Sequence, residues 1–381
     1  MKKIGIVTWF NYHNFGTALQ VTALYNAIAD LGYEPSVINY LPKRDPLFAK
    51  PYTLTRAKTL YIPRIKKKFQ SYNHLTKSKE QTNKFNNFLG NMSFTKRIEN
   101  DFTSVNEEFD AFVCGSDQIW SPTTFNSSYF FLDFVKDNNK KVSYAPSMGV
   151  SKVDDIHFKA RVKPLVEAFS FLSVREQEGA EIINSICGRM PKVVLDPTLL
   201  HSKEQWDALT KPQNTDGKYI LCYFLGQNKE SWKHVNRLHK ELDLPVKVIP
   251  IFKDDLTSPY ECLTDVCPKE FIQLVKNASL VCTDSFHGTI FSILYGRDFY
   301  VYERFSSKDP SSRNSRIYNL LNKFKLGERL VVNPTSPIVK NDIDWGSVYA
   351  ILDEERVDCL NYLKNALTSV TNTDTNLDRG V

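Results

Sequence analysis

The feature that most constrains this chain is a regular alternation of short apolar runs with longer segments of helical apolar spacing. The run KKIGIVTWF (2–10) leads into a polar loop and then into apolar residues at positions 18, 19, 23, 24, 27 and 28, the spacing of one helix face. The run SVINY (36–40) follows. A strand, a helix and a second strand in this order form a βαβ unit, whose crossover requires parallel strands.

The same alternation runs through the chain twice, first to about residue 210 and again from YILCYFLG (219–226) onward. A length of 381 residues suits two domains of ordinary size. We therefore predict an α/β protein of two Rossmann-like doubly wound domains that face a central cleft. The predicted parts are an N-terminal domain (1–210), a C-terminal domain (211–340), a helix (341–370) that packs back on the first domain, and a disordered tail (371–381).

The segment at about 43–100 breaks this rhythm. It is rich in lysine and arginine with interleaved tyrosine and phenylalanine, and Arg64–Lys68 is its densest basic run. We predict a basic helical insertion in the first domain. Its basic face is either simply solvated or meets anionic lipid head groups.

Composition and charge limit the compartment and the partners. The formal net charge of +6 is a mild, diffuse excess, which argues against nucleic acid as a partner. Seven cysteines without a CxxC pair indicate free thiols in a reducing compartment. No run approaches the ~20 apolar residues of a membrane span, and the first apolar run is too short for a signal peptide. We predict a cytoplasmic protein, with peripheral contact at the inner face of the membrane as the alternative that the insertion offers.

The stretch TDSFHGT (283–289) stands between an apolar run and an apolar helix. A helix N-terminus that follows a parallel strand offers unpaired N–H groups and the positive end of the helix dipole to an anion. Ser285 and Thr289 add hydroxyl groups, and Gly288 lets an anion approach the backbone. His287 can act as an acid or a base near neutral pH. The alternative is that Ser285 caps a core helix and His287 is a buried residue.

Three arginines in two other stretches are candidates for binding an anion. Arg175 ends the run FLSVR (171–175), where a guanidinium can bind a carboxylate or phosphate through two parallel hydrogen bonds. The alternative is a salt bridge to Glu176 or Glu178. Arg313 and Arg316 lie in the polar stretch SSRNSR (311–316) and are further candidates.

Two loops after apolar runs carry groups that suit a sugar. In GSDQIW (115–120), Ser116 and Asp117 can bind a sugar hydroxyl, Asp117 can act as a general base, and Trp120 can stack on a pyranose ring. The loop NYHNFGT (11–17), with Asn14 and Gly16, is rich in hydrogen-bonding groups before a helix. The alternative is that Ser116 or Asp117 merely caps the next turn.

Familiar nucleotide, protease and esterase motifs are absent from the sequence. It has no P-loop, HExxH, GxSxG or GxGxxG, and its one Asp-x-Asp, at Asp342 and Asp344, has the position of a helix cap. The histidines are scattered along the chain. We therefore predict neither a metal nor a cofactor.

Five features follow one another between residues 2 and 330. They are NYHNFGTALQ (11–20), FVCGSDQIW (112–120), SYAPSMG (143–149), the pair SVRE (173–176) and VVLDPTLL (193–200), and TDSFHGTIFSILYG (283–296) with SSRNSRI (311–317). Their combination resembles the polysaccharide pyruvyl transferase family. The resemblance implies a GT-B-like pair of domains and the transfer of pyruvate from phosphoenolpyruvate onto two hydroxyls of a sugar, as a cyclic ketal.

The resemblance also implies roles for the residues above. The phosphoenolpyruvate-binding arginine and the helix-start histidine of the family fall on Arg175 and His287. Many members have an arginine two residues before that histidine, where this chain has Ser285, so Arg313 or Arg316 is expected to supply the missing charge. We assign His287 as acid and Asp117 as base or acceptor ligand. The full expected sets are Arg175, Ser285, His287, Gly288, Thr289, Arg313 and Arg316 for phosphoenolpyruvate, and Asn14, Gly16, Ser116, Asp117 and Trp120 for the acceptor.

The expected acceptor is a galactose- or hexosamine-type unit of a capsular or exopolysaccharide precursor, carried on a lipid diphosphate. Two other hypotheses stand beside this one. The first is a GT-B glycosyltransferase with a nucleotide-sugar donor, whose ribose Glu303 would hold. The second is a non-catalytic binding protein of polysaccharide assembly.

Overall fold

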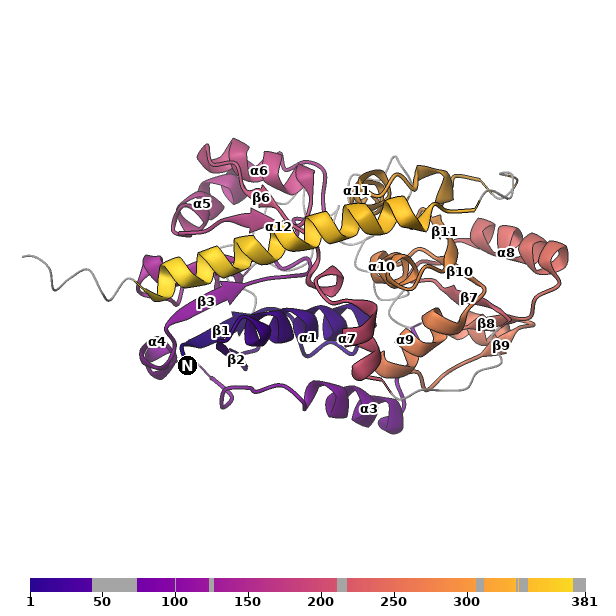
Figure 1. The fold of residues 1–381 in the computed structure, drawn as a ribbon, viewed down its shortest axis with the longest axis horizontal. Helices are drawn as coiled ribbons and strands as arrows, with labels where there is room; N and C mark the ends of the chain where they lie inside the picture. The colour runs from indigo at the N-terminus through magenta and orange to yellow at the C-terminus, as the bar shows by residue number, and fades with distance from the viewer. Residues whose placement is uncertain are drawn as a thin grey trace, which may run out of the picture.

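The computed structural model of the protein describes residues 1–42, 74–99, 101–122, 127–210, 218–305, 312–333, 335 and 342–372. Strands and helices alternate along this part of the chain, and the strands form two large parallel sheets (Figure 1). The predicted fold class is therefore confirmed: the molecule is α/β, with two doubly wound domains in a GT-B-like arrangement.

The first domain is built on a parallel sheet with the strand order β2-β1-β3-β4. The inner strands are nearly continuous apolar runs and are buried, as expected for a parallel sheet covered by helices. A bridge between Val142 and Phe171 connects this sheet to a short β5–β6 pair. The strands are β1 (Lys3–Val7), β2 (Glu34–Val37), β3 (Ala111–Cys114), β4 (Lys141–Ser143), β5 (Ser173–Val174) and β6 (Lys192–Val193). The helices are α1 (Phe15–Asp30), α3 (Lys79–Leu89), α4 (Thr103–Glu108), η2 (Ser128–Phe131), η3 (Asn138–Lys140), α5 (Ile156–Glu167), α6 (Gln177–Cys187), η4 (Pro197–Leu199) and α7 (Lys203–Ala208).

The second domain is built on a parallel sheet with the strand order β12-β11-β10-β7-β8-β9. The short edge strands β9 and β12 were not evident in the sequence because each has only two residues. The strands are β7 (Ile220–Tyr223), β8 (Val246–Val248), β9 (Glu261–Cys262), β10 (Leu280–Thr283), β11 (Asp298–Tyr302) and β12 (Leu330–Val331). The helices are α8 (Lys229–Leu242), η5 (Lys253–Thr257), α9 (Pro268–Asn277), α10 (Phe286–Leu294), α11 (Ser315–Lys323) and η6 (Gly327–Arg329).

Each sheet has a topological switch point, a strand whose two neighbours on opposite sides are reached by separate connections of the chain. In the first sheet β1 lies between β2 and β3, and in the second sheet β7 lies between β8 and β10. In open α/β sheets a ligand binds outside the carboxyl ends of the strands at such a point. The loops that follow β1, β3, β7 and β10 are therefore the places where topology predicts a site.

Helix α1 lies between the two domains. It is buried on almost every side because it packs against β2 of its own domain and against α9 and α10 of the second domain. This explains why the sequence of α1, FGTALQVTALYNAIAD, is apolar nearly all round rather than along one stripe. The loop before α1 is consequently held at the domain interface.

Helix α12 (Trp345–Thr371) runs along both domains and is the long yellow helix in Figure 1. Its first half contacts the second domain, where Glu355 pairs with Lys323 of α11 at 2.6 Å. Its second half contacts the first domain, where Asp358 pairs with Lys192 at 2.7 Å and the helix packs near β3 and β4. The predicted return of the C-terminal helix to the first domain describes the second half of α12. The predicted tail lies outside the described residues from 373 onward.

The described part of the predicted insertion, residues 74–99, packs in part on the second domain. Residues 74–89, called here the crossing segment, pack on the second domain: the Leu75 N–H donates to Ile251 O at 2.9 Å, and the Gln81 amide donates to Val266 O at 2.9 Å. Lys84 also pairs with Glu270 at 3.1 Å. The run Arg64–Lys68, on which the membrane prediction rests, lies outside the described residues.

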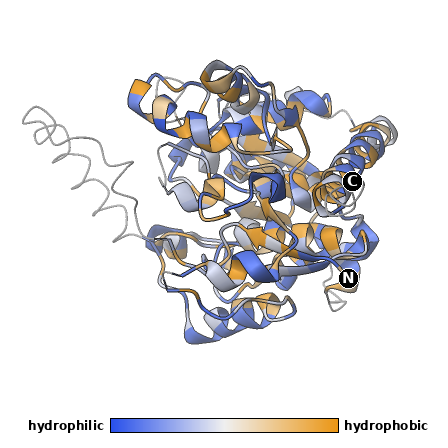
Figure 2. Ribbon diagram, turned by 90° about the vertical axis from the view of Figure 1, so that its left-hand side faces the viewer, coloured by the Kyte–Doolittle hydropathy of each residue, from blue (hydrophilic) through white to orange (hydrophobic). Residues whose placement is uncertain are grey.

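The hydropathy pattern fits a water-exposed surface. Figure 2 shows hydrophobic and hydrophilic residues alternating along the outer helices, as in amphipathic helices that cover a sheet. Among the residues that the structure describes, none of the helices combines the length and apolar character needed to cross a bilayer.

Candidate active site

A cavity of about 750 Å³ lies between the two domains at the carboxyl ends of their strands. The first domain contributes the loops after β1 and β3, and the second contributes the loops after β7, β8, β10 and β11. A neighbouring cavity of about 460 Å³ has Arg175 and Asp196 in its wall and shares Phe286 and Arg316 with the first. The loops selected from the sequence therefore converge on one region.

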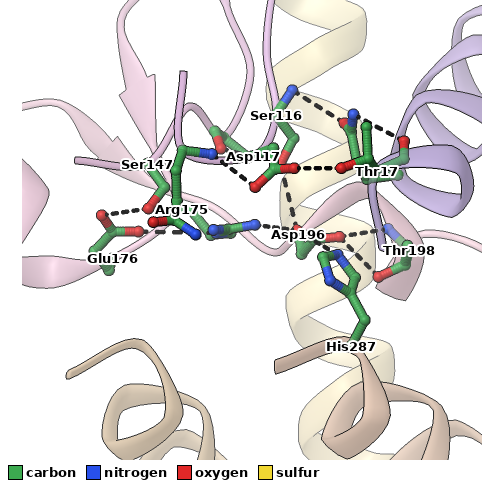
Figure 3. Close-up of polar contacts among 12 residues, drawn as sticks. Thr17, Ser116, Asp117, Ser147, Arg175, Glu176, Asp196, Thr198 and His287 are labelled. Atoms are coloured by element: carbon green, nitrogen blue, oxygen red, sulfur yellow. Dashed lines mark hydrogen bonds and ion pairs between the residues drawn. The ribbon is translucent and has the colours of Figure 1, made fainter. Parts of the chain in front are cut away.

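Asp196 is the centre of the polar network in this region (Figure 3). It directly follows the strand-like run VVL, and its carboxylate accepts hydrogen bonds from Arg175 Nη1 at 2.6 Å and from the Thr198 backbone and hydroxyl at 3.0 and 2.7 Å. His287 Nε2 lies 3.6 Å from the same carboxylate. Burial alone would raise the pKa of Asp196, but the charges of His287 and Arg175 and the hydrogen bond from Thr198 hold it well below the usual range.

Arg175 is held by carboxylates, but they do not use all of its hydrogen-bond donors. Its side chain is buried, with Nη1 on Asp196 and Nε 3.8 Å from Glu176 Oε2. Within the described residues, Nε and Nη2 have no hydrogen-bond partner. The guanidinium lies 4.6 Å from the ring centroid of Phe286 at the start of α10. Arg175 thus makes an ion pair, as one alternative predicted, but its main partner is Asp196 rather than Glu176 or Glu178, and two of its nitrogens remain available.

His287 is the second residue of α10 and projects from the second domain toward Asp196 of the first (Figure 3). Its ring lines the larger cavity. The other side of the ring packs on Gly16 so closely that a Cβ at that position would fall 2.1 Å from Nδ1. Gly16, predicted as an acceptor ligand, instead makes the space that His287 occupies, because it has no side chain to offer a ligand.

The N-terminus of α10 is only partly available to an anion. Ser285 caps the helix by accepting from the Gly288 N–H at 3.2 Å, and the buried Thr289 hydroxyl donates to Ser285 O at 3.0 Å. Gly288 packs against Thr283, whose hydroxyl oxygen would be 2.6 Å from an added Cβ. Gly288 and Thr289 therefore serve the helix start rather than a ligand, which corrects their prediction. The first N–H groups, of Phe286 and His287, have no acceptor inside the helix.

Arg316 supplies a second buried guanidinium beside the first. Its guanidinium is 5.6 Å from the Phe286 ring centroid, and its Nη groups face the Gln118 amide oxygen at 3.1 and 3.3 Å in the orientation that satisfies both groups. Burial and the charge of Arg175 lower the pKa of Arg316 to about 9. Two arginines brought together without solvent create a site in which an anion would be strongly stabilised. Arg313 also lines the larger cavity.

Asp117 lies on the wall of the cavity that belongs to the first domain. Its backbone has a φ of 65°, a conformation that residues other than glycine adopt rarely and mostly where structure imposes it. Its carboxylate accepts from the Thr17 hydroxyl at 3.0 Å and from the Gln118 N–H at 2.8 Å. Asn14 lines the same cavity and caps α1 by accepting from the Thr17 N–H at 3.3 Å.

Two predicted acceptor residues do not reach the cavity. Trp120 is only 1% exposed, stacks on Phe131 at 4.9 Å and donates its indole N–H to Phe130 O at 2.9 Å. Ser116 is fully buried and donates to Ala145 O at 3.1 Å. The Trp120 prediction is wrong because its ring points into the protein interior, where the indole N–H already has a partner. The Ser116 hydroxyl also lies 3.3 Å from Asp196 Oδ2, so Ser116 belongs to the polar network around Asp196 rather than to the wall of the larger cavity.

Several site residues were not evident in the sequence. Asp196 sits in LDPT, which is typical of a capped turn, and it does cap η4. Asp284, next to the predicted anion site, also lines the cavity, where its carboxylate accepts from the Leu225 and Gly226 N–H groups at 2.6 and 2.8 Å. Burial raises the pKa of Asp284 to about 6, although Arg304 and these N–H groups oppose the rise. Thr17 carries no distinct signal in the sequence because threonine early in a helix is common.

The crossing segment contributes to the cavity as well. Lys77 lines it, with its ammonium 5.1 and 5.9 Å from the ring centroids of Phe85 and Phe15. Burial lowers the pKa of Lys77. At least this part of the insertion is therefore neither a solvated face nor a lipid contact, because it forms a wall of the site.

Glu303, the residue assigned to ribose in the glycosyltransferase hypothesis, accepts a hydrogen bond from the Tyr318 hydroxyl. It is not among the residues that line the cavity. All seven cysteines are free thiols. Over the ranges that the structure describes, no three histidine, cysteine, aspartate or glutamate side chains are grouped so as to hold a metal ion.

The model of the family described as "Polysaccharide pyruvyl transferase" matches residues 14–306. This range includes Asp117, Arg175, Asp196 and His287 and extends over most of both domains. The chain belongs to the polysaccharide pyruvyl transferase family. The resemblance inferred from the sequence is thereby confirmed, and membership of this transferase family supports an enzyme that acts in polysaccharide pyruvylation. No curated protein matches the chain.

Solved structures with a similar course of the chain come from nucleotide-sugar enzymes. The S. aureus MnaA structure with UDP has 14% identity and a TM-score of 0.48, over 96% of this chain and 91% of that one. The UDP-GlcNAc 2-epimerase from Neisseria meningitidis bound to UDP-GlcNAc has 10% identity and a TM-score of 0.46, over 97% and 94%. An alpha-glucosyltransferase in complex with UDP and DNA has 9% identity and a TM-score of 0.47, over 97% and 99%.

Proposed function

We propose that this protein transfers the pyruvyl group of phosphoenolpyruvate onto two hydroxyls of a sugar and forms a cyclic ketal. The observation that carries the proposal is the meeting of Arg175, Arg316 and His287 around Phe286 and Asp196, with buried guanidinium nitrogens that have no partner among the described residues. A buried donor without an acceptor is costly, so such nitrogens are expected to meet a ligand.

Phosphoenolpyruvate carries a phosphate and a carboxylate on one small carbon skeleton. Arg175 would bind its oxygens through Nε and Nη2, and Arg316 through Nε. The first N–H groups of α10 would bind phosphate at the positive end of the helix dipole. Arg313 and Arg316 lie in the second domain, after β11. They would supply the positive charge that many family members carry two residues before the histidine, where this chain has Ser285. Because arginines and the helix dipole neutralise the donor, the reaction needs neither a metal nor a cofactor.

The chemistry then requires one acid and one base. His287 would give a proton to carbon 3 of the enol while a sugar hydroxyl, losing its proton to Asp117, attacks carbon 2. The bond between carbon 2 and the oxygen that bridges to phosphorus then breaks. This releases inorganic phosphate, which takes up one proton. The second hydroxyl then attacks the same carbon and loses its own proton, which closes the ketal. An acid and a base placed in this way each contribute roughly 10²–10⁴-fold.

The acceptor that we propose is a galactose- or hexosamine-type unit of a capsular or exopolysaccharide precursor on a lipid diphosphate carrier. Such a precursor is assembled on the cytoplasmic side of a membrane, which is where the enzyme would meet it. Family membership supports the sugar, and the cationic cavity wall at Lys77 and Arg304 is compatible with an anionic carrier.

The test is release of inorganic phosphate from phosphoenolpyruvate in the presence of a panel of free and lipid-linked saccharides. We expect phosphate release only when phosphoenolpyruvate and a suitable acceptor are both present. The acceptor should gain about 70 Da, the mass of pyruvic acid less one water. Thermal stabilisation by UDP but not by phosphoenolpyruvate would instead favour a nucleotide-sugar glycosyltransferase. Saccharide binding without any turnover would favour a non-catalytic role.

The contact between Gly16 and His287 gives a prediction. In Gly16→Ala the new Cβ would fall 2.1 Å from His287 Nδ1, so the ring must leave its present position beside Asp196. We expect the rate of phosphate release to fall about 100-fold, the usual effect of a displacement of about 1 Å at a catalytic group. The matched control is Gly346→Ala, because Gly346 is also the second residue of a helix and lies outside the cavity. Equal rates in the two variants would contradict the steric role of Gly16.

A further inference from the structure

We infer that Trp9 and Tyr12, in the loop after β1, form the subsite on which the pyranose ring of the acceptor stacks. This inference rests on the proposed function and makes its acceptor side specific. It also replaces Trp120, which the structure removes from the site. Trp9 and Tyr12 both line the larger cavity, and Tyr12 is 50% exposed although it is a large aromatic residue.

Trp9 lies on the same wall of the cavity as Asp117, the group that would activate the sugar. Strands β1 and β3 are neighbours, and just beyond their ends the Thr8 hydroxyl donates to Ser116 O at 3.3 Å. Trp9 and Asp117 directly follow these two contacting residues, and both line the cavity. A sugar held on Trp9 would therefore lie on the same wall as the Asp117 carboxylate, with His287, Arg313 and Arg316 of the second domain on the facing side of the cavity.

The indole of Trp9 is held in place from behind. Phe130 packs against it edge to face with a centroid distance of 6.2 Å, and Tyr12 meets it edge to face at 5.6 Å. The backbone at Trp9 is fixed because its carbonyl accepts from the Gln20 amide at 3.1 Å, and the same amide donates to Thr8 Oγ1 at 3.1 Å. A fixed ring binds at a low cost in conformational entropy.

The chemistry of this surface indicates the class of ligand. An aromatic face suits the C–H side of a pyranose, which is apolar, while the hydroxyls at the edge of the ring stay free to reach polar groups. The carboxylate on this wall is that of Asp117, the proposed base. The expected occupant is thus an uncharged hexopyranoside whose apolar face covers Trp9 and whose hydroxyls point toward Asp117.

The experiment compares Trp9→Ala, Trp9→Phe and Tyr12→Ala with the wild-type protein. We expect the KM for the saccharide acceptor to rise at least about tenfold in Trp9→Ala, and less in Trp9→Phe, which keeps a ring. The KM for phosphoenolpyruvate should stay within about twofold, because its proposed ligands are on other elements. The matched control is Trp345→Ala, since Trp345 also pairs with a tyrosine, Tyr349, at 5.8 Å but lies on α12 outside the cavity.

A second readout does not depend on turnover. Methyl β-D-galactopyranoside and methyl N-acetyl-β-D-glucosaminide are titrated without phosphoenolpyruvate, and tryptophan fluorescence is recorded. We expect a saturable change with at least one glycoside that is lost in Trp9→Ala and kept in Trp345→Ala. If saccharide binding depends on Trp9 but phosphoenolpyruvate is never consumed, the subsite stands and the proposed reaction fails. If turnover is normal and the acceptor KM is unchanged in both Trp9→Ala and Tyr12→Ala, the subsite is wrong while the reaction stands.

Discussion

Replacing Arg175 with alanine is expected to abolish pyruvyl transfer and at the same time to destabilise the fold. The guanidinium is buried against Asp196 at 2.6 Å and near Glu176 at 3.8 Å, so its removal leaves two buried carboxylates without their cation. Breaking a buried pair from one side costs about 3–5 kcal/mol in the free energy of unfolding. Phosphate release and urea unfolding, measured on the same preparation, should both show the change.

The conservative variant Arg175→Lys separates binding from stability. A lysine keeps a cation beside Asp196 but lacks the planar pair of N–H groups that can bind a carboxylate or phosphate through two bonds. We expect most of the stability to return while the KM for phosphoenolpyruvate stays at least about tenfold above the wild-type value. A lysine variant with a normal KM would show that the arginine serves the fold alone. An alanine variant of full stability would contradict the buried ion pair.

Replacing His287 with glutamine is expected to lower kcat by roughly 10²–10⁴-fold, the contribution of one general acid. The loss of stability should be smaller than in Arg175→Ala, because Asp196 keeps its hydrogen bonds from Arg175 and Thr198 when the His287 charge is removed. Glutamine has a similar length and a donor group but cannot transfer a proton. The measurements are phosphate release under saturating phosphoenolpyruvate and a thermal unfolding curve.

The matched control for this variant is His239→Gln. His239 lies on α8, where its Nδ1 is 2.7 Å from Leu244 O, and it does not line the cavity. The control should keep full activity, with at most a small loss of stability. A kcat in His287→Gln that equals that of the control would remove the histidine from the mechanism.

Much of the fold was predictable because its signals are local. A buried parallel strand needs a continuous apolar run on both faces, and runs such as Ile4–Val7 and Leu280–Cys282 carry that signal in the sequence. Once βαβ order is assigned, topology sends the loops after the strands to one edge of each sheet. This is why Asp117 and His287 could be assigned to one site although they are 170 residues apart in the chain.

The parts that were not predictable depend on side-chain direction and on long-range pairing. Trp120 follows Asp117 by three residues, yet its ring turns inward to stack on Phe131 while Asp117 faces the cavity. Asp196 reads as the cap of a short turn, and nothing in the residues around it indicates that Arg175 and His287 meet its carboxylate. The position of the crossing segment on the second domain is likewise decided by partners such as Ile251 and Val266, far along the chain.

Helix α12 has a consequence for how the two halves of the molecule can move. It is one continuous helix of 27 residues, joined by Glu355 to the second domain and by Asp358 to the first. A continuous helix resists bending, so α12 restricts rotation of one domain relative to the other. Any hinge motion must bend α12 or detach it from one of the two domains. A chain that ends before Trp345 would keep every residue proposed for the reaction but would lose the helix that connects the two domains.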